Sequence, residues 1–310
     1  MIIRAPGLIQ STDILLPRSV ADKGATSYCV FLVDDFLRPE FMEMLRAEFP
    51  EDLLRKRMGA RLAINIDLND QSDEVNSFLA KSPIWRSYVQ AWRSDEVLDD
   101  LMMLFKNQMR YRYVPWWRPL LMLRINSRAK LEVTVFLSAY RRGFRLTPHT
   151  DDKFKLLSLI HYVPSIDSRA EGRGGTAFFE PRAGVSRHHL RVLTEWSKGL
   201  RRLFPLWMAP SLEASLDRRY FESDELNTSQ QSKFSNLFVS SKYIGYEDNR
   251  ISGFVKNDWS MHEVNLEDFP EGELRRAVLI NIRLRPTQSY RMIKPIEQLL
   301  VKMKRMIHKS

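Results

Sequence analysis

The stretch LTPHTDDKFKLLSLIHYV, residues 146–163, contains both a strand-like pattern and two candidate metal ligands. His149 and Asp151 are two positions apart, so on an extended backbone their side chains point to the same face. A third ligand has to come from elsewhere, and His262 lies in NDWSMHEV, shortly after the strand-like segment ISGFV. Two histidines and one carboxylate can bind one face of an octahedral Fe(II) and leave three coordination positions open. The pattern therefore predicts a metal centre of the kind that activates oxygen.

The segments around this stretch predict further short strands. LEVTVFLSAY at 131–140 alternates and is rich in β-branched and aromatic residues. KLLSLIHYV, GGTAFFE, ISGFV and AVLINIRL follow it, separated by clusters of Gly, Pro and Asp. Because a mainly helical region precedes these strands, we expect an α+β protein. Its mainly β core is expected to be a sandwich or barrel with an N-terminal helical layer.

The sequence before residue 125 predicts one strand, over residues 28–33, followed by helices. The apolar spacing in RPEFMEMLRAEF, SPIWRSYVQAW and SDEVLDDLMMLFKNQM is typical of amphipathic helices. Residues whose side-chain oxygens cap helices precede each segment or open it. The expected N-caps are Asp34 or Asp35, Ser82 followed by Pro83, and Ser94 followed by acidic residues.

We divide the chain into three parts. Residues 1–125 are the helical support region, residues 126–290 are the β core, and residues 291–310 are a basic helix with its apolar residues on one side. A long interruption, residues 182–250, separates GGTAFFE from ISGFV. We expect this interruption to be an insertion that covers the mouth of the core as a lid.

Several motifs occur in a characteristic order: HTD at 149–151, YVP at 162–164, GGTAFFEP at 174–181, SMHEV at 260–264 and RRAVLINIRL at 275–284. With them, residues 130–290 resemble the Fe(II)/2-oxoglutarate-dependent oxygenase superfamily, in particular its prolyl-4-hydroxylase-like branch. VDDFLRPEFMEMLRAEFP at 33–50 is similar to the opening helix of that branch. The resemblance implies a double-stranded β-helix, or jelly roll. It also implies that His149, Asp151 and His262 hold the catalytic iron, with 2-oxoglutarate and O₂ as co-substrates.

The resemblance further implies that a basic residue at the start of the last core strand binds the distal carboxylate of 2-oxoglutarate. Both Arg275 and Arg276 stand there. The family places the basic residue two before a small one, which favours Arg275 because Ala277 follows it, and an arginine fork suits a carboxylate. Arg276 remains the alternative. Tyr162 stands where related enzymes offer a hydroxyl to the same carboxylate. Weaker pocket candidates are Lys155, Ser158 and Tyr140.

The predicted activity is hydroxylation of an unactivated C–H bond, with release of succinate and CO₂. Asp151 favours this reaction over halogenation, because related halogenases have Gly or Ala in place of the carboxylate. Small or glycan-type acidic molecules are the expected primary substrates, since the expected lid is rich in arginine and histidine. Two alternatives stay open. One is a prolyl-type protein hydroxylase with the same site, and the other is a non-enzymatic jelly-roll module that binds an anionic polymer or a membrane surface.

Positive charge is unevenly distributed along the chain. The 48 Lys and Arg against 38 Asp and Glu give a net charge of +10, and all of this excess lies in residues 182–220 and 291–310. A uniformly basic nucleic-acid-binding protein has a different pattern. We do not expect nucleic acid as a partner, because the lid offers only isolated aromatic residues for stacking, Trp196, Phe204 and Trp207. Residues 295–308 could contact a membrane peripherally, although packing on the domain is the preferred interpretation.

Other function classes lack their motifs. Cys29 is the only cysteine, which excludes an internal disulfide framework. No HExxH zinc helix, GxSxG elbow or phosphate-binding P-loop occurs. The N-terminus has no apolar segment of signal-peptide length, and no apolar run approaches the ~20 residues of a membrane span. We therefore expect a cytoplasmic protein.

Overall fold

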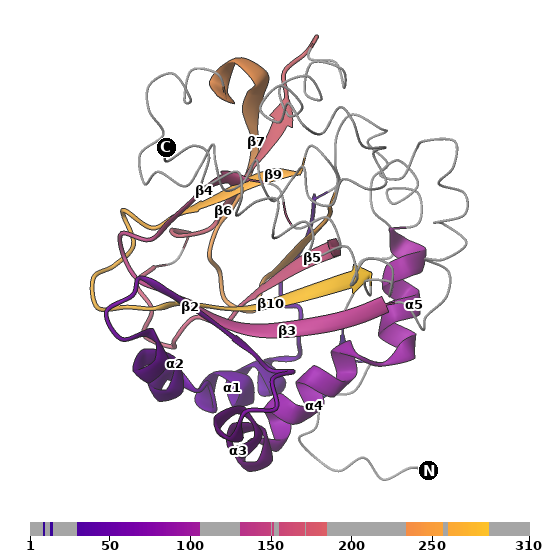
Figure 1. Ribbon diagram of the computed structural model, residues 1–310, viewed down its shortest axis with the longest axis vertical. Coiled ribbons are helices and arrows are strands. Elements are labelled where there is room, and N and C mark those ends of the chain that lie inside the picture. The colour runs from indigo at the N-terminus through magenta and orange to yellow at the C-terminus, as the bar shows by residue number, and fades with distance from the viewer. Residues whose placement is uncertain are drawn as a thin grey trace, which may run out of the picture.

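The computed structural model describes residues 9, 13–14, 30–105, 131–149, 151, 155–170, 172–184, 234–256 and 260–284. Within these residues the strands form two antiparallel sheets, one above the other (Figure 1). The six-stranded sheet has the order β1 (Val30–Val33), β8 (Ile251–Val255), β5 (Lys155–Tyr162), β10 (Arg275–Leu284), β3 (Leu131–Tyr140) and β2 (Ala63–Asp67). The four-stranded sheet has the order β4 (Arg145–His149), β9 (Met261–Asn265), β6 (Thr176–Pro181) and β7 (Phe238–Ile244).

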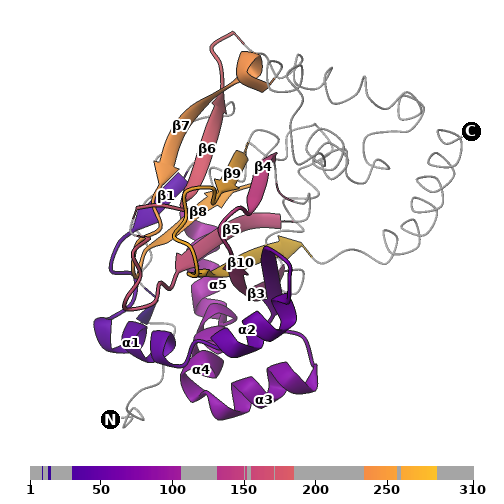
Figure 2. The ribbon, with the colours of Figure 1, turned by 90° about the vertical axis from the view of Figure 1, so that its left-hand side faces the viewer.

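Helices cover the outer face of the six-stranded sheet. They are α1 (Pro39–Ala47), α2 (Glu51–Met58), α3 (Asp73–Lys81), α4 (Pro83–Trp92) and α5 (Asp95–Leu104). Figure 2 shows them on the side of that sheet away from the four-stranded sheet. The described chain therefore has three layers: helices, a large sheet and a small sheet. None of these five helices is long and apolar enough to cross a membrane.

Alternation along the strands of the large sheet separates two hydrophobic cores. Leu159 and Val278 belong to the core under the helices, whereas Ile160 and Ala277 belong to the core between the two sheets. The inner core also contains side chains of the small sheet, among them Phe178. Because both sheets contribute to this core, their inner faces enclose a common interior.

Several predicted elements are confirmed. β3 and β8 coincide with the predicted strands at 131–140 and 251–255. Ser82 and Ser94 cap α4 and α5, since each hydroxyl accepts a hydrogen bond from the backbone N–H three residues later. Pro83 occupies the first position of α4, where its missing N–H has no intrahelical partner to lose.

The predicted capping of the first helix by Asp34 or Asp35 is wrong. α1 begins at Pro39, its N-cap residue is Arg38, and no side chain caps it. The proline explains the start, because its ring fixes φ and disfavours a helical conformation of the residue before it. Arg38 accordingly has φ −59° and ψ 142°.

Some strands have no counterpart in the sequence analysis. β2, from the predicted helical region 1–125, pairs with β3 at one edge of the large sheet, and β7 lies inside the range 182–250 that was expected to be the lid. The remaining part of that range from residue 185 to 233, and the predicted helix at 291–310, lie outside the described residues.

His161 anchors the helical layer to the large sheet. It is fully buried on the outer face of β5, its Nδ1 lies 2.9 Å from the Tyr88 hydroxyl of α4, and its ring meets Phe36 edge-on at 5.1 Å. Burial lowers the pKa of His161 to about 3. The imidazole is therefore neutral in the folded protein at neutral pH, and protonating it would place a charge in this apolar layer.

We expect the free energy of unfolding to fall as the pH drops from about 6.5 toward 3, because the unfolded chain, with an ordinary histidine pKa, binds a proton that folded His161 resists. The contribution of His161 amounts to at most about 1.4 kcal/mol per pH unit. Urea unfolding in EDTA at several pH values, for the native chain and His161→Gln, measures it. Equal pH slopes for the two proteins would contradict this role.

Candidate metal centre

Strand pairing brings the two predicted histidine ligands together. β4 and β9 are antiparallel neighbours, and His149 is directly opposite His262 in their register. The two ring centroids are 4.3 Å apart. Asp151 follows the end of β4 and is buried. One ligand atom from each of the three residues lies within 4.8 Å of the other two.

Hydrogen bonds set which nitrogen of each histidine is available. His149 donates through Nδ1 to the carbonyl of Thr147 at 2.9 Å, and His262 donates through Nδ1 to the carbonyl of Ser260 at 3.0 Å. A carbonyl can only accept, so Nδ1 carries the hydrogen and Nε2 keeps its lone pair. Burial lowers the pKa of His149 to about 3, with His262 adding to the effect, and burial also lowers the pKa of His262. Both rings are thus neutral and able to bind a metal through Nε2.

Asp151 supplies the negative charge of the group. Its Oδ1 accepts from Lys155 Nζ at 2.8 Å, and its Oδ2 accepts from the Ser158 hydroxyl. Burial alone would raise the pKa of the Asp151 carboxyl, but the charge of the Lys155 ammonium keeps it below its usual value. The carboxylate is therefore ionised at neutral pH. Two neutral imidazoles and one carboxylate form a donor set that suits Fe(II).

Arg275 is a buried cation of the inner core. Only 1% of it is exposed, its Nε donates to the carbonyl of Gly174, and a terminal nitrogen lies 3.4 Å from the Tyr162 hydroxyl and 3.5 Å from Thr176 Oγ1. Its guanidinium also lies 5.4 Å from the centre of the Tyr140 ring. Among the described residues no carboxylate pairs with it. A buried charge without a counter-ion is costly, so this environment suits an anionic ligand.

Arg276 faces the opposite side of β10. Its Nε donates to the carbonyl of Val163 at 2.9 Å, its NH1 lies 3.2 Å from a carboxylate oxygen of Glu51 in α2, and its guanidinium lies 4.6 Å from the centre of the Phe49 ring. It therefore links β10 to the helical layer. Of the two candidate arginines, Arg275 alone faces the interior that contains the triad.

The inner face of β6 connects Arg275 to the triad. Thr176 lies beside Arg275, and Phe178, two residues along, stacks on His262 with ring centroids 6.2 Å apart. Two residues of a strand span about 7 Å. Thr176 and Phe178 therefore bring Arg275 and His262 to neighbouring positions along one inner face.

Sequence reasoning missed several residues of this interior. Thr176 contacts both Tyr162, at 3.0 Å, and Arg275, although the sequence pattern predicts only a strand at this position. Gly174 has φ +67°, a conformation that favours glycine, and its carbonyl accepts a hydrogen bond from Arg275 Nε. Phe254 packs against the His262 ring at 4.7 Å. Alternation of side chains along GGTAFFE and ISGFV is the sequence signal that could have placed these residues on the same face as the triad.

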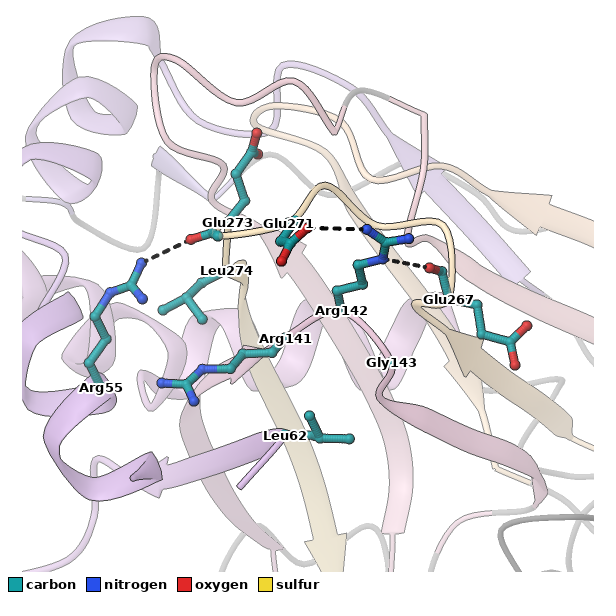
Figure 3. Close-up of a pocket in the computed structure, with 10 residues that line it drawn as sticks. Arg55, Leu62, Arg141, Arg142, Gly143, Glu267, Glu271, Glu273 and Leu274 are labelled. Atoms are coloured by element: carbon teal, nitrogen blue, oxygen red, sulfur yellow. Dashed lines mark hydrogen bonds and ion pairs between the residues drawn. The ribbon is translucent and has the colours of Figure 1, made fainter. Parts of the chain in front are cut away.

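A polar hollow elsewhere on the molecule does not contain these residues. It lies between α2 and the turns that join β3 to β4 and β9 to β10 (Figure 3). Arg142 lies 3.7 Å from a carboxylate oxygen of Glu271, and Arg55 donates to the carbonyl of Gly272. This hollow adjoins the first residues of β4 and the last of β9, whereas His149 ends β4 and His262 is near the start of β9. We assign it no part in the chemistry.

No family model and no curated protein matches the chain. The solved structures that resemble it include the following three. A prolyl-4-hydroxylase from Pseudomonas putida is 15% identical, with a TM-score of 0.36, and the match covers 83% of this chain and 93% of that one. A prolyl hydroxylase from Trichoplax adhaerens, in complex with a peptide fragment of the hypoxia inducible factor oxygen degradation domain, is 11% identical, with a TM-score of 0.38 and coverages of 82% and 83%.

The third structure is HygX from Streptomyces hygroscopicus with nickel and 2-oxoglutarate bound. It is 13% identical, with a TM-score of 0.41, and the match covers 84% of this chain and 89% of that one. Two of these three structures are prolyl hydroxylases. The identities and TM-scores are low, so the function of this chain is inferred from its own residues.

Proposed function

We propose that the chain is an Fe(II)- and 2-oxoglutarate-dependent oxygenase that hydroxylates an unactivated C–H bond and releases succinate and CO₂. The observation that carries this proposal is one interior with two complementary sites. Two neutral imidazoles and a carboxylate converge at one place, and a buried arginine without a carboxylate partner among the described residues lies further along the same inner face.

The strand order supports a double-stranded β-helix for this core. Successive strands from β3 to β6 alternate between the large and the small sheet, and so do β7 to β10. Eight antiparallel strands in two facing sheets are the arrangement expected of a jelly roll. In such a fold the interior between the sheets holds the ligand, and here that interior contains the triad, Tyr162 and Arg275.

Each site residue has a role in this proposal. His149, Asp151 and His262 would hold the iron, and bound there Fe(II) would supply three open positions for the co-substrate and O₂. Arg275 would bind the distal carboxylate of 2-oxoglutarate through its guanidinium, and Tyr162 would donate its hydroxyl to the same carboxylate. Since Thr176 and Gly174 hold these two side chains in place, the carboxylate site is preorganised.

Aromatic packing around His262 serves the same chemistry. Phe178 and Phe254 are both fully buried or nearly so and contact the His262 ring. They exclude water from one side of the site and fix the orientation of the ring. A dry, rigid surrounding strengthens the electrostatic interactions of the bound anions.

For the primary substrate we propose a small or glycan-type acidic molecule. The support is the excess of positive charge in residues 182–220, which lie between β6 and β7 in the sequence. Positive charge on a protein attracts anionic substrates and raises their association rate. This effect weakens with salt, so kcat/KM for such a substrate should fall as ionic strength rises.

Succinate release tests the proposal directly. The purified chain is incubated aerobically with Fe(II) and 2-oxoglutarate and with separate pools of acidic sugars, peptides and oligonucleotides. We expect succinate formation that requires both Fe(II) and 2-oxoglutarate and is stimulated by the acidic small-molecule pool. Binding of 2-oxoglutarate to the nickel-loaded protein, measured by calorimetry, provides a readout without turnover. A chain that binds neither metal nor 2-oxoglutarate would overturn the proposal.

A further inference from the structure

Lys155 brings a positive charge to the carboxylate that the proposed function assigns to the iron. Its Nζ lies 2.8 Å from Asp151 Oδ1, and the two side chains are only 21% and 9% exposed. The hydroxyl of Ser158 donates to the other oxygen of the same carboxylate. Both oxygens of Asp151 are therefore bound by the protein's own groups.

An irregularity in β5 makes this arrangement possible. Leu157 pairs with Ile282, whereas Lys155 pairs with the next residue, Arg283, so Leu156 is an extra residue in the strand. Leu156 and Leu157 both belong to the core under the helices. Without the bulge, Lys155 and Ser158, three positions apart, would point to opposite faces. With it, both reach Asp151 on the inner face.

We propose that Lys155 is a positioning residue that neutralises and orients Asp151 before the metal binds, and whose charge opposes the metal once it is bound. This inference rests on the proposed function for the identity of the site. Lys155 thereby lets the interior fold with Asp151 ionised and in place, at the expense of metal affinity. Ser158 shares the orienting role but carries no charge.

The two roles have opposite effects on metal affinity. Removing the ammonium takes away repulsion between a unit charge and a divalent ion in a buried setting, which favours the metal. The same change also removes one of the two hydrogen bonds that orient the Asp151 side chain, which weakens metal binding. Ser158 still holds the other oxygen of Asp151, so this loss of affinity is limited. The charge effect should therefore dominate. A residue with a merely structural role would weaken metal binding when removed, or leave it unchanged.

The test is the affinity for Ni²⁺ alone, measured by calorimetry without 2-oxoglutarate or substrate. Lys155→Met is expected to bind Ni²⁺ at least about tenfold more tightly than the native chain. Lys155→Arg keeps the charge and should stay within about threefold, while Ser158→Ala should bind equally or more weakly. The matched control is Lys56→Met. Lys56 is an exposed lysine of α2 whose Nζ lies 3.1 Å from a carboxylate oxygen of Glu74.

Thermal unfolding supplies the second readout. Metal-free Lys155→Met should unfold at a lower temperature than the native chain, because Asp151 loses its counter-ion, and saturating Ni²⁺ should narrow the difference. Lys155→Gln, which keeps a polar side chain, is measured in parallel in case the methionine variant does not fold. If the native chain binds Ni²⁺ and both variants bind it equally or more weakly, the proposed role of Lys155 is overturned, while the proposed function stands. Failure of the native chain to bind Ni²⁺ would overturn the proposed function as well.

Discussion

Replacement of His149 or of Asp151 by alanine is expected to abolish Fe(II)-dependent succinate formation, with a loss of at least about 100-fold. Each change removes one of the three groups whose ligand atoms converge within 4.8 Å. Loss of a residue that only supports a metal ligand already costs 10- to 100-fold in affinity or activity, so loss of a ligand should cost more. The measurement is the initial rate of succinate release at saturating Fe(II) and 2-oxoglutarate.

Glu263→Gln is the matched control for this experiment. Glu263 follows His262 on β9 and, by alternation, points to the outer face of the small sheet. The substitution changes a charge next to the site in sequence without reaching its interior. We expect its rate to stay within about twofold of the native rate. Full activity of the His149 and Asp151 variants, with folding verified by circular dichroism, would sink the assignment of the triad.

The second large effect is expected at Arg275. Arg275→Met should raise the KM for 2-oxoglutarate by about 100-fold, because removal of a buried, hydrogen-bonded charge from a carboxylate site costs 2–5 kcal/mol. kcat at saturating 2-oxoglutarate should change less, since the triad stays intact. Arg275→Lys keeps the charge but not the fork, and should fall between the native chain and the methionine variant.

The neighbouring arginine separates this role from a structural one. Arg276 contacts Glu51 and the carbonyl of Val163 at the helical layer. Arg276→Met should therefore lower the midpoint of thermal unfolding while the KM for 2-oxoglutarate stays within about threefold. A rise in KM for Arg276→Met and not for Arg275→Met would contradict the assignment of Arg275 to the carboxylate of 2-oxoglutarate.

Local pattern predicted much of this molecule. Short runs rich in β-branched and aromatic residues, bounded by turn residues, located β3 and β8 to the residue, because such side chains fit a pleated, buried surface. Ser82 and Ser94 revealed helix starts because capping is a local interaction. Asp34 and Asp35 predicted the wrong start for α1, because Pro39 imposes a stronger local constraint.

Other features depend on partners that are distant in the chain. β2 has a short, mixed sequence and becomes a strand by pairing with β3. The bulge in β5 depends on the register with β10, so alternation could not show that Lys155 and Ser158 meet at Asp151. His161 and Tyr88, 73 positions apart, form their hydrogen bond only when α4 packs on the sheet.

The sequence by itself determined the chemical content of the site: an imidazole and a carboxylate two residues apart, a second imidazole, and an arginine at the start of the last strand. These are properties of spacing and side-chain type, which a linear pattern records. The sequence also favoured Arg275 over Arg276, through the small residue two positions after it. Only the tertiary structure decided which groups surround each arginine: Gly174 and Tyr162 around Arg275, and Glu51 around Arg276. These groups come from segments that are distant in the chain, and no local pattern contains them.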